Sequence, residues 1–458
     1  MQDETTNRKY FGPIEFYQKT FRIAAPLALQ NLLMSGQSLI DTLMVSWIGM
    51  VSAVGTAAQV DVLSGLISWG VIGGIGMFAA QFFGAKDERN LKRCTGLSLT
   101  LVLANAAFWI LASTFFGRQI LTFYIKDPVV VEDGYNYLQI AKWGMLTGSF
   151  SFCFGNMFRN TQKPAIALRF SILTSVLNVF LNWVLIFGKG PFPAMGVKGA
   201  ALATVLAQGV SACLFVGYAF KTRQPFVGSF REMFGFDFAF VKPILQRIWP
   251  LIVNESTFGV GQTLFVKAFG VLGKPQMDAY YVGNHIYEVM TFVIYGYGNA
   301  VQILLGTELG RGKIENAKRE CDYHIGLSGI LSVCLVCFLV LFAKPLVALF
   351  RLTDPAVEQL AVLIVYVFAV KSSMRLYNFM IFCVLRSGGD AKIIQFLDSG
   401  LEWAVGLPLA FLSVHFGIGN IALVLLITQA EQLIRLILGM KRIKTYKWAR
   451  DLTKTITS

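Results

Sequence analysis

Long apolar runs dominate this chain and leave few ways for it to fold. They recur roughly every 35–40 residues along 458 positions, and hydrophobic residues make up 55% of the composition. About 20 helical residues cross the ~30 Å hydrocarbon core of a bilayer. Each run is long enough for one crossing, so the pattern predicts an all-α membrane protein. We expect twelve transmembrane helices, at 22–47, 52–82, 94–116, 134–158, 165–188, 197–220, 244–271, 279–309, 322–346, 358–386, 391–416 and 418–440.

The positive charge of the chain is distributed unevenly between alternate loops. Most of the 40 Lys and Arg residues fall before the first predicted span, in every second loop after it, and behind the last span. Cytoplasmic loops of membrane proteins carry such an excess. We therefore expect a multi-pass protein of the plasma (inner) membrane with both termini cytoplasmic. This pattern accounts for the net charge of +14, and nucleic acid is not an expected partner.

Comparison of the sequence with itself reveals a repeat. Matching motifs recur 224 to 227 positions apart, always at equivalent spans or loops. A nearly constant offset at equivalent places indicates an internal duplication. The matches are Pro26-Leu27 with Pro250-Leu251, Gly36-Gln37-Ser38-Leu39 with Gly261-Gln262-Thr263-Leu264, residues 84–93 with 310–319, and Arg159 with Arg386.

The repeat predicts the architecture. Six spans per repeat is an even number, so both halves enter the membrane from the same side. We expect two parallel six-helix halves related by a pseudo-two-fold axis along the membrane normal, with a central cavity at their interface. The predicted division is an N-terminal half at 1–220, a cytoplasmic linker at 221–243, a C-terminal half at 244–440 and a basic cytoplasmic tail at 441–458.

An ordered series of short motifs runs along the whole chain. Its members are Ile40-Asp41-Thr42-Leu43-Met44 with Gly49, Gln81 with Gly84, Asn178 with Asn182, Ile186-Phe187-Gly188, Gly196-Val197-Lys198-Gly199-Ala200-Ala201, Glu255, Gly298-Asn299-Ala300 with Gly306 and Gly310, and Leu385-Arg386. This series resembles the multidrug and toxic compound extrusion (MATE) family, in the superfamily that also holds lipid-linked sugar flippases. The resemblance implies export of amphipathic, often cationic compounds in exchange for sodium ions or protons.

Two positions depart from familiar branches of that family. Where one branch carries an aspartate eleven residues before the Leu-Arg arginine, this chain has Arg375. Where other branches carry an aspartate in the fifth span, it has Asn182. The coupling schemes of those branches therefore cannot be transferred whole.

Ionisable residues within a span are expensive and mark candidate sites. Asp41 lies about 9 Å inside the outer end of the first span, as estimated from the helical rise. Asn182 lies at a matching depth in the fifth span, with Asn178 one turn away on the same face. A carboxylate with two amide oxygens suits a hard cation such as sodium. Alternatively, Asp41 binds a proton. Either way, we expect Asp41, Asn178 and Asn182 to take part in ion coupling.

The second half has its own intramembrane charges. Glu255 and Arg375 are each about eleven residues from a predicted cytoplasmic span end, so we expect them to form a buried charge pair. Glu255 is also a candidate for ion coupling. Further candidate cavity or substrate residues are Gln37, Asp61, Gln262, His285 and Glu288.

No catalytic or nucleotide-binding motif accompanies these charges, so we do not expect an enzyme. The favoured function is secondary active efflux of amphipathic, cationic compounds by alternating access, driven by Na⁺ or H⁺. The alternative is a flippase for lipids or lipid-linked sugars. We expect small-molecule substrates, the lipid bilayer as surroundings, a monomer, and neither a cofactor nor a structural metal.

Overall fold

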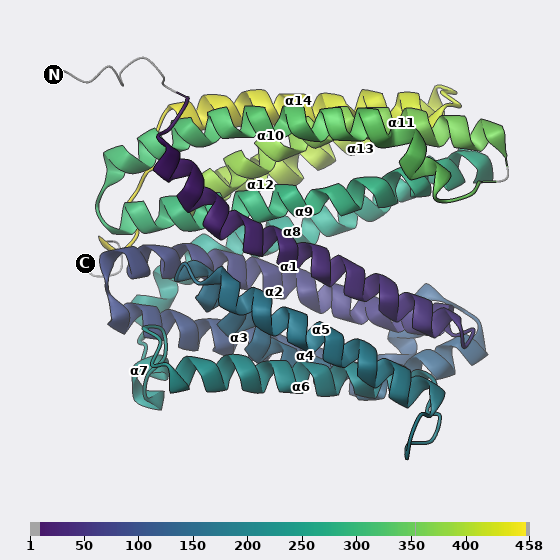
Figure 1. The fold of residues 1–458 in the computed structure, drawn as a ribbon, viewed down its shortest axis with the longest axis horizontal. Helices are drawn as coiled ribbons and strands as arrows, with labels where there is room; N and C mark the ends of the chain where they lie inside the picture. Colours follow the sequence, from purple (N-terminus) through teal and green to yellow (C-terminus); the bar gives the residue numbers. More distant parts are fainter. Residues whose placement is uncertain (1–9, 353, 455–458) are drawn as a thin grey trace. The chain divides into compact units, whose positions relative to one another are not determined.

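The computed structural model describes residues 10–352 and 354–454, and these form helices joined by short loops (Figure 1). One of the twelve long helical segments is interrupted by two π-helical turns, η2 and η3. The elements are α1 (Ile14–Ser46), α2 (Val51–Ala85), α3 (Glu88–Tyr124), α4 (Pro128–Asn160), α5 (Pro164–Phe187), α6 (Val197–Lys221), α7 (Phe230–Phe234), α8 (Phe238–Gly270), α9 (Lys274–Gly310), α10 (Ile314–Ala348), α11 (Pro355–Ser387), α12 (Ala391–Gln395), η2 (Phe396–Gly400), η3 (Glu402–Gly406), α13 (Leu407–His415) and α14 (Ile421–Lys444).

Each predicted span corresponds to one long helical segment, and most of these segments extend beyond the predicted bounds. The predicted span at 94–116, for example, is the middle of the 37-residue α3. Polar residues continue the helix past its apolar part, and Asp87 caps it by accepting a hydrogen bond from the backbone N of Asn90 at 3.0 Å. In the described part of the chain, nine helical segments are long and apolar enough to cross a membrane. The long helices α1, α4 and α8 are not among them.

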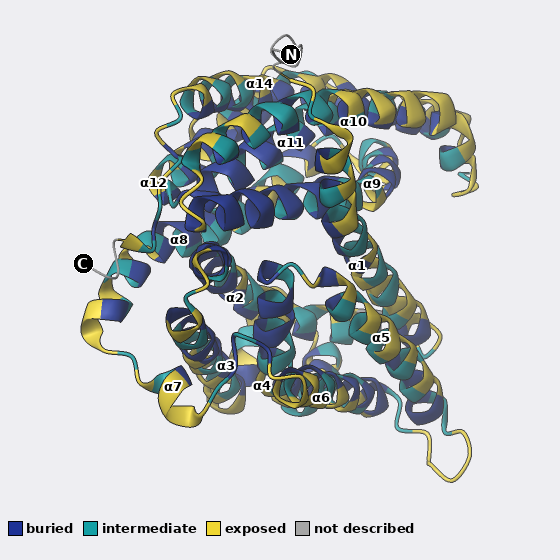
Figure 2. Cartoon of the chain, turned by 60° about the vertical axis from the view of Figure 1, so that its left-hand side comes forward, coloured by how far each residue is buried: buried dark blue, intermediate teal, exposed yellow. Residues whose placement is uncertain are grey.

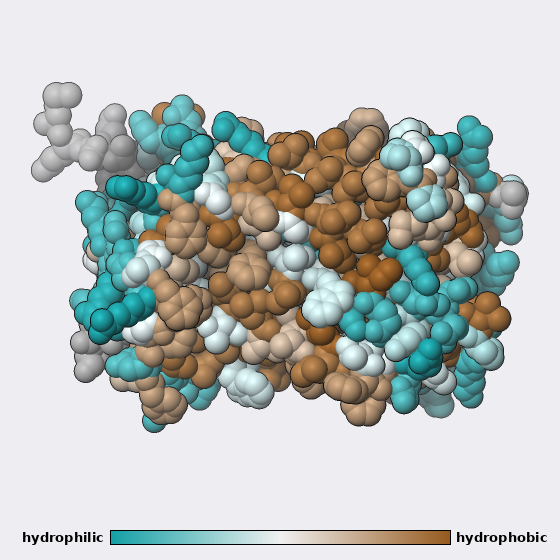
Figure 3. Space-filling view, turned by 90° about the horizontal axis from the view of Figure 1, so that it is seen from below, coloured by the Kyte–Doolittle hydropathy of each residue, from teal (hydrophilic) through white to brown (hydrophobic). Residues whose placement is uncertain are grey.

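The surface of the protein also suits a bilayer. Large hydrophobic side chains such as Phe123, Trp47 and Leu341 are exposed. On the face shown in Figure 3, hydrophobic side chains cover most of the middle, whereas hydrophilic side chains gather toward both ends. An exposed apolar area of this extent is costly in water and favourable in lipid.

The two halves repeat each other in detail, down to their caps and turns. Asp127 and Asp354 each precede a proline at the first helical position and accept hydrogen bonds from backbone N–H groups two residues on, at 2.9 and 2.8 Å. Left-handed backbone also recurs at matching sites. The matched residues are Gly49 with Gly273, Lys86 with Gly312, Gln162 with Gly389, and Arg223 with Tyr446.

The chain divides into two compact units. Unit 2 is Leu29–Ile252, and unit 1 is Met1–Ala28 together with Val253–Ser458, so the division falls within α1 and α8. In unit 2, α4 packs against α2, α3 and α6; in unit 1, α11 packs in the same way against α9, α10 and α14. Buried residues form dark stripes where these helices meet, most visibly on α9 and α11 (Figure 2).

Each half ends its sixth helix with a turn that returns an aromatic ring to its own unit. Phe226 follows α6 and is fully buried, with its ring centroid 5.1 Å from that of Phe158. Trp448 follows α14, is fully buried, and donates from Nε1 to the backbone O of Ile443 at 3.0 Å. Only a glycine fits at position 388, because a Cβ there would collide with the backbone O of Trp448. Much of the predicted tail is therefore packed against unit 1.

The fifth helix of each half differs. In unit 2, α5 is a continuous α-helix, whereas its counterpart in unit 1 changes from α12 through η2 and η3 to α13. A π-helical turn displaces backbone groups from their usual partners. Asn254 compensates, accepting from the backbone N of Ser399 at 3.1 Å while its amide donates to Asp398 at 3.0 Å. Arg435 donates to the backbone O of Asp398 at 2.9 Å.

Candidate ion and substrate sites

Asp41, on α1, lies against two asparagines of α5. The Nδ2 group of Asn182 donates to Oδ1 of Asp41 at 2.7 Å and also to Oδ1 of Asn178 at 3.3 Å. Both asparagines are at most 2% exposed, whereas Asp41 is partly exposed. Three of the four residues predicted for ion coupling therefore lie together, and the fourth, Glu255, belongs to unit 1.

The hydrogen bonding of this group is incomplete. The Oδ1 atom of Asn182 and the Nδ2 atom of Asn178 are buried and have no partner among the described residues. The amide nitrogen of Asn182 lies between an oxygen of Asp41 and an oxygen of Asn178 and donates to both. Rotation of that amide would turn its own oxygen toward these two, so that three oxygens would face one another without a donor between them. The cluster can thus offer oxygen ligands to a sodium ion, or an acceptor to a proton carried by Asp41.

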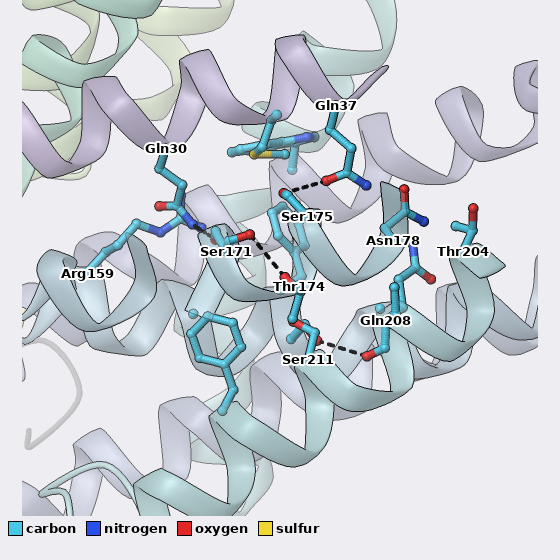
Figure 4. A pocket seen from close by; sticks show the side chains of 18 residues that line it. Gln30, Gln37, Arg159, Ser171, Thr174, Ser175, Asn178, Thr204, Gln208 and Ser211 are labelled. Atoms are coloured by element: carbon cyan, nitrogen blue, oxygen red, sulfur yellow. Dashed lines mark hydrogen bonds between the residues drawn. The ribbon is translucent and has the colours of Figure 1, made fainter. Parts of the chain in front are cut away.

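A cavity of about 300 Å³ lies in unit 2, between α1, α2, α4, α5 and α6. Two hydrogen bonds between α1 and α5 border it: Gln30 donates to Ser171 at 2.8 Å, and Ser175 donates to Gln37 at 2.7 Å. Figure 4 shows Asn178 and Arg159 at different places along its wall. Most of the labelled lining is polar but uncharged, and apolar side chains such as Trp69 and Phe152 complete it.

The predicted pair of Glu255 and Arg375 is wrong. Glu255 accepts from Nη2 of Arg386 at 2.8 Å, while Nη1 of Arg375 lies 3.7 Å from Oδ1 of Asp398. Eleven residues make about three helical turns, so both arginines share one face of α11. The prediction therefore identified the face of α11 that meets Glu255 but not the height along it. Depth was counted from the predicted start of the span at residue 244, whereas α8 begins earlier, at Phe238.

Asp398 belongs to a larger network of charges in unit 1. Arg435 bonds both Asp398 and Glu431, and the second contact is the i,i+4 pair within α14 that its spacing favours. Gln262 donates to Glu402, which is 1% exposed. A Cβ at position 261 would collide with the Glu402 carboxylate, so Gly261 allows this close approach.

Sequence reasoning missed Asp398 and Glu402. Both lie within the predicted span at 391–416, spaced i,i+4 and hence on one helical face. The general rule on ionisable residues within spans would have marked them as candidates.

The other predicted cavity residues do not join these groups. Asp61 is exposed and forms no hydrogen bond or ion pair with the described residues. His285 and Glu288 are exposed, and Nδ1 of His285 lies 3.7 Å from Oε2 of Glu288. Glu288 also accepts a hydrogen bond from Nδ2 of Asn284 at 2.8 Å. Neither lines the cavity of unit 2. Residues 10–352 and 354–454 contain no cluster of three or more His, Cys, Asp or Glu residues suited to a metal ion.

Comparison with known proteins identifies the family. Residues 26–184 and 250–412 match the MatE family model, one segment in each repeat. The chain belongs to the MATE family. It is therefore a membrane transporter and not an enzyme.

Curated MATE relatives match along most of their length. The probable multidrug resistance protein YoeA of Bacillus subtilis is 23% identical over 403 residues, which cover 85% of each chain. The probable multidrug resistance protein NorM of Thermotoga maritima is 24% identical over 415 residues, covering 88% of this chain and 86% of the relative.

Solved structures share the fold. An outward-facing multidrug resistance MATE transporter superposes with a TM-score of 0.84 at 18% identity, covering 97% of this chain and 100% of that one. A mutant of the Vibrio cholerae MATE transporter VcmN gives a TM-score of 0.86 at 15% identity, with 95% and 99% coverage. At such identities the likeness concerns the fold alone.

Proposed function

We propose that this MATE transporter exports amphipathic compounds in exchange for Na⁺ or H⁺, with Asp41 as the coupling group. The observation that carries the proposal is the incomplete hydrogen bonding around Asp41: a partly exposed carboxylate meets two buried amides, with no fixed cation bound to it among the described residues. Relatives named as multidrug resistance proteins support the class of cargo.

The contrast with Glu255 explains the choice of Asp41. Arg386 holds the Glu255 carboxylate at 2.8 Å, so that group is committed to a fixed partner. Asp41 is bound only by neutral amides, which an ion can displace or reorient. An exporter needs an ion that binds one of its two states more tightly, because equal binding to both shifts neither. Ion binding at Asp41 would neutralise its charge and favour release of a cationic compound.

The lining of the unit 2 cavity favours export of small amphipathic compounds over flipping of lipid-linked sugars. A pyrophosphate-linked sugar requires several cations in its binding site. Arg159 is the one cationic side chain among the residues that line the described cavity. Two carboxylates of unit 2, Asp41 and Asp61, have no cationic partner in the described residues, which suits a positively charged group on the cargo.

Transport in proteoliposomes tests the proposal. Wild-type protein should export substrate under an imposed sodium gradient or an imposed proton gradient, which also identifies the ion. Asp41→Asn should fold and still bind substrate, but it should lose gradient-driven export. Export at the wild-type rate by purified Asp41→Asn protein would remove Asp41 from the mechanism and transfer the proposal to Glu255.

We also propose that both termini and the basic loops at 83–93, 159–169, 221–247 and 311–319 are cytoplasmic. The positive-inside pattern supports this orientation. A single cysteine at position 89, on a background without other cysteines, should resist an impermeant thiol reagent added to intact cells and react after permeabilisation. Labelling of that cysteine from outside would reverse the orientation.

A further inference from the structure

Equivalent arginines in the two repeats have different surroundings. Arg159 and Arg386 each lie in the last turn of the fourth helix of their repeat, where the helix dipole favours a positive charge equally. Arg386 donates to Glu255 at 2.8 Å. The offset of 225 at Gly36 and Gly261 places Gln30 where unit 1 has Glu255, and the offset of 224 at Pro26 and Pro250 places it on the preceding residue, Asn254. Figure 4 shows Gln30 beside Arg159, so the arginine of unit 2 faces a neutral amide instead of a carboxylate.

Arg159 is correspondingly short of partners. Its Nε atom is buried without a hydrogen-bond acceptor in the described part of the chain, as is the Nε atom of Arg386, but Arg159 has no carboxylate partner there. Gln30 is already engaged, since its amide donates to Ser171 at 2.8 Å. A half-buried guanidinium without a carboxylate carries a desolvation cost, and an anion supplied from outside would offset that cost.

The cavity next to Arg159 can hold such an anion. Hydroxyl groups of Ser151, Ser171 and Ser211 line the same cavity and can donate hydrogen bonds to it. Trp69 and Phe152, with ring centroids 4.8 Å apart, add an apolar wall. The volume of about 300 Å³ lies at the small end of the range for ligand pockets.

We propose that Arg159 is an anion subsite, which binds the carboxylate of an amphipathic cargo whose apolar part lies against Trp69 and Phe152. This inference rests on the proposed export function and narrows its cargo to compounds that carry a carboxylate, with or without a cationic group elsewhere. The guanidinium offers the planar fork of donors that suits a carboxylate. In unit 1 the protein itself supplies the carboxylate, as Glu255; in unit 2 the cargo supplies it.

Equilibrium dialysis of the full-length protein in phosphatidylcholine nanodiscs tests the subsite. The probes are coumarin-3-carboxylate and coumarin-3-carboxamide, which share one ring system and differ in charge. Wild-type protein should bind the carboxylate at least about tenfold more tightly than the amide, as expected of a charge-assisted contact. Arg159→Gln should abolish this preference. Gln30→Glu should abolish it too while keeping the arginine, because it installs the carboxylate found in unit 1.

A matched control is Lys163→Gln, which removes a nearby positive charge that bonds Gln224 and does not line the cavity. It should keep the preference. The inference is overturned if wild-type protein shows no preference, if neither probe binds, or if Gln30→Glu keeps the preference. It is also overturned if phosphatidylglycerol in the nanodiscs abolishes carboxylate binding, because the arginine would then take a lipid headgroup. Gradient-driven transport is measured separately, so its absence counts against the export function and not against the subsite.

Discussion

In unit 1 most of the buried charges are paired with opposite charges, Glu402 being an exception, whereas in unit 2 Asp41 and Arg159 are not paired. Glu255 has Arg386, and Asp398 has Arg375 and Arg435. Asp41 and Arg159 have only neutral side chains around them. The two units share helices, caps and turns, so the fold tolerates both arrangements. A charge whose partner is part of the protein stabilises the scaffold, and a charge without one remains available to an ion or a substrate.

The fifth helices follow the same contrast. The repeat offset of 227, set by Arg159 and Arg386, aligns Ser171 with Asp398 and Ser175 with Glu402, so neutral side chains of α5 correspond to acids in unit 1. Those acids coincide with the π-helical turns η2 and η3. Asn254 and Arg435 bond the displaced backbone as well as the Asp398 carboxylate. In unit 1 the irregular helix and the charge network therefore support each other.

The largest expected effect comes from breaking the matched pair. Glu255→Gln leaves Arg386 uncompensated, and loss of one partner of a buried pair costs about 3–5 kcal/mol. Glu255 is 26% exposed, so we expect the lower end, about 3 kcal/mol, in denaturant unfolding of the detergent-solubilised protein. The control is Gln30→Glu in unit 2, which should not destabilise because it gives Arg159 a partner. Equal destabilisation by both changes would contradict the comparison.

The shared part of the repeats should respond alike in both units. Phe226→Ala and Trp448→Ala each remove a fully buried ring from the turn after the sixth helix. Truncations of this kind cost about 3–5 kcal/mol in well-packed cores, and about 2 kcal/mol is expected here because both turns lie near the surface ends of their units. The measurement is thermal unfolding of the two variants side by side. A stable Trp448→Ala protein beside an unstable Phe226→Ala protein would show that the C-terminal turn is dispensable.

The sequence predicted the fold well because hydrophobic runs and the positional repeat are local or periodic signals. Twelve spans, the duplicated halves and the proximity of Asp41, Asn178 and Asn182 follow from spacing along helices. Side-chain pairing within unit 1 could not be derived in this way. Arg375 and Arg386 share a face of α11, and only the vertical register of α8 against α11 decides which one meets Glu255.

The interrupted helix of unit 1 was also beyond prediction. Nothing in the composition of residues 391–416 indicates π-helical turns, since their cause is tertiary: Asn254 on α8 and Arg435 on α14 bond the displaced backbone. The absence of a carboxylate partner for Arg159, in contrast, could have been predicted from the repeat. Aligning Gln30 with Glu255 already shows one carboxylate missing.

A smaller effect should separate two equivalent glutamines. Gln262 donates to the carboxylate of Glu402, whose Oε2 is buried without a partner in the described residues, whereas Gln37 accepts from the hydroxyl of Ser175. Gln262→Leu leaves the Glu402 carboxyl, which is 1% exposed, without its hydrogen-bond partner, and an unsatisfied buried polar group costs about 1–3 kcal/mol. Gln262→Leu should therefore destabilise more than Gln37→Leu in unfolding experiments, because the Ser175 hydroxyl is only partly buried. The reverse order would mean that Glu402 does not depend on Gln262.

The smallest effect concerns the nature of the coupling ion at Asp41. Asn182→Ala removes the amide that donates to Asp41 at 2.7 Å and that could turn its oxygen toward a bound sodium ion. If sodium is the ion, the variant loses one of several oxygen ligands, so its sodium affinity should fall by about tenfold, or about 1.4 kcal/mol, while transport persists at high sodium. If a proton is the ion, the loss of a hydrogen bond to Asp41 should shift the pH dependence of export and leave it indifferent to sodium. Transport assays at graded sodium and graded pH distinguish the two, and an Asn182→Ala protein that matches wild type in both would remove α5 from the coupling site.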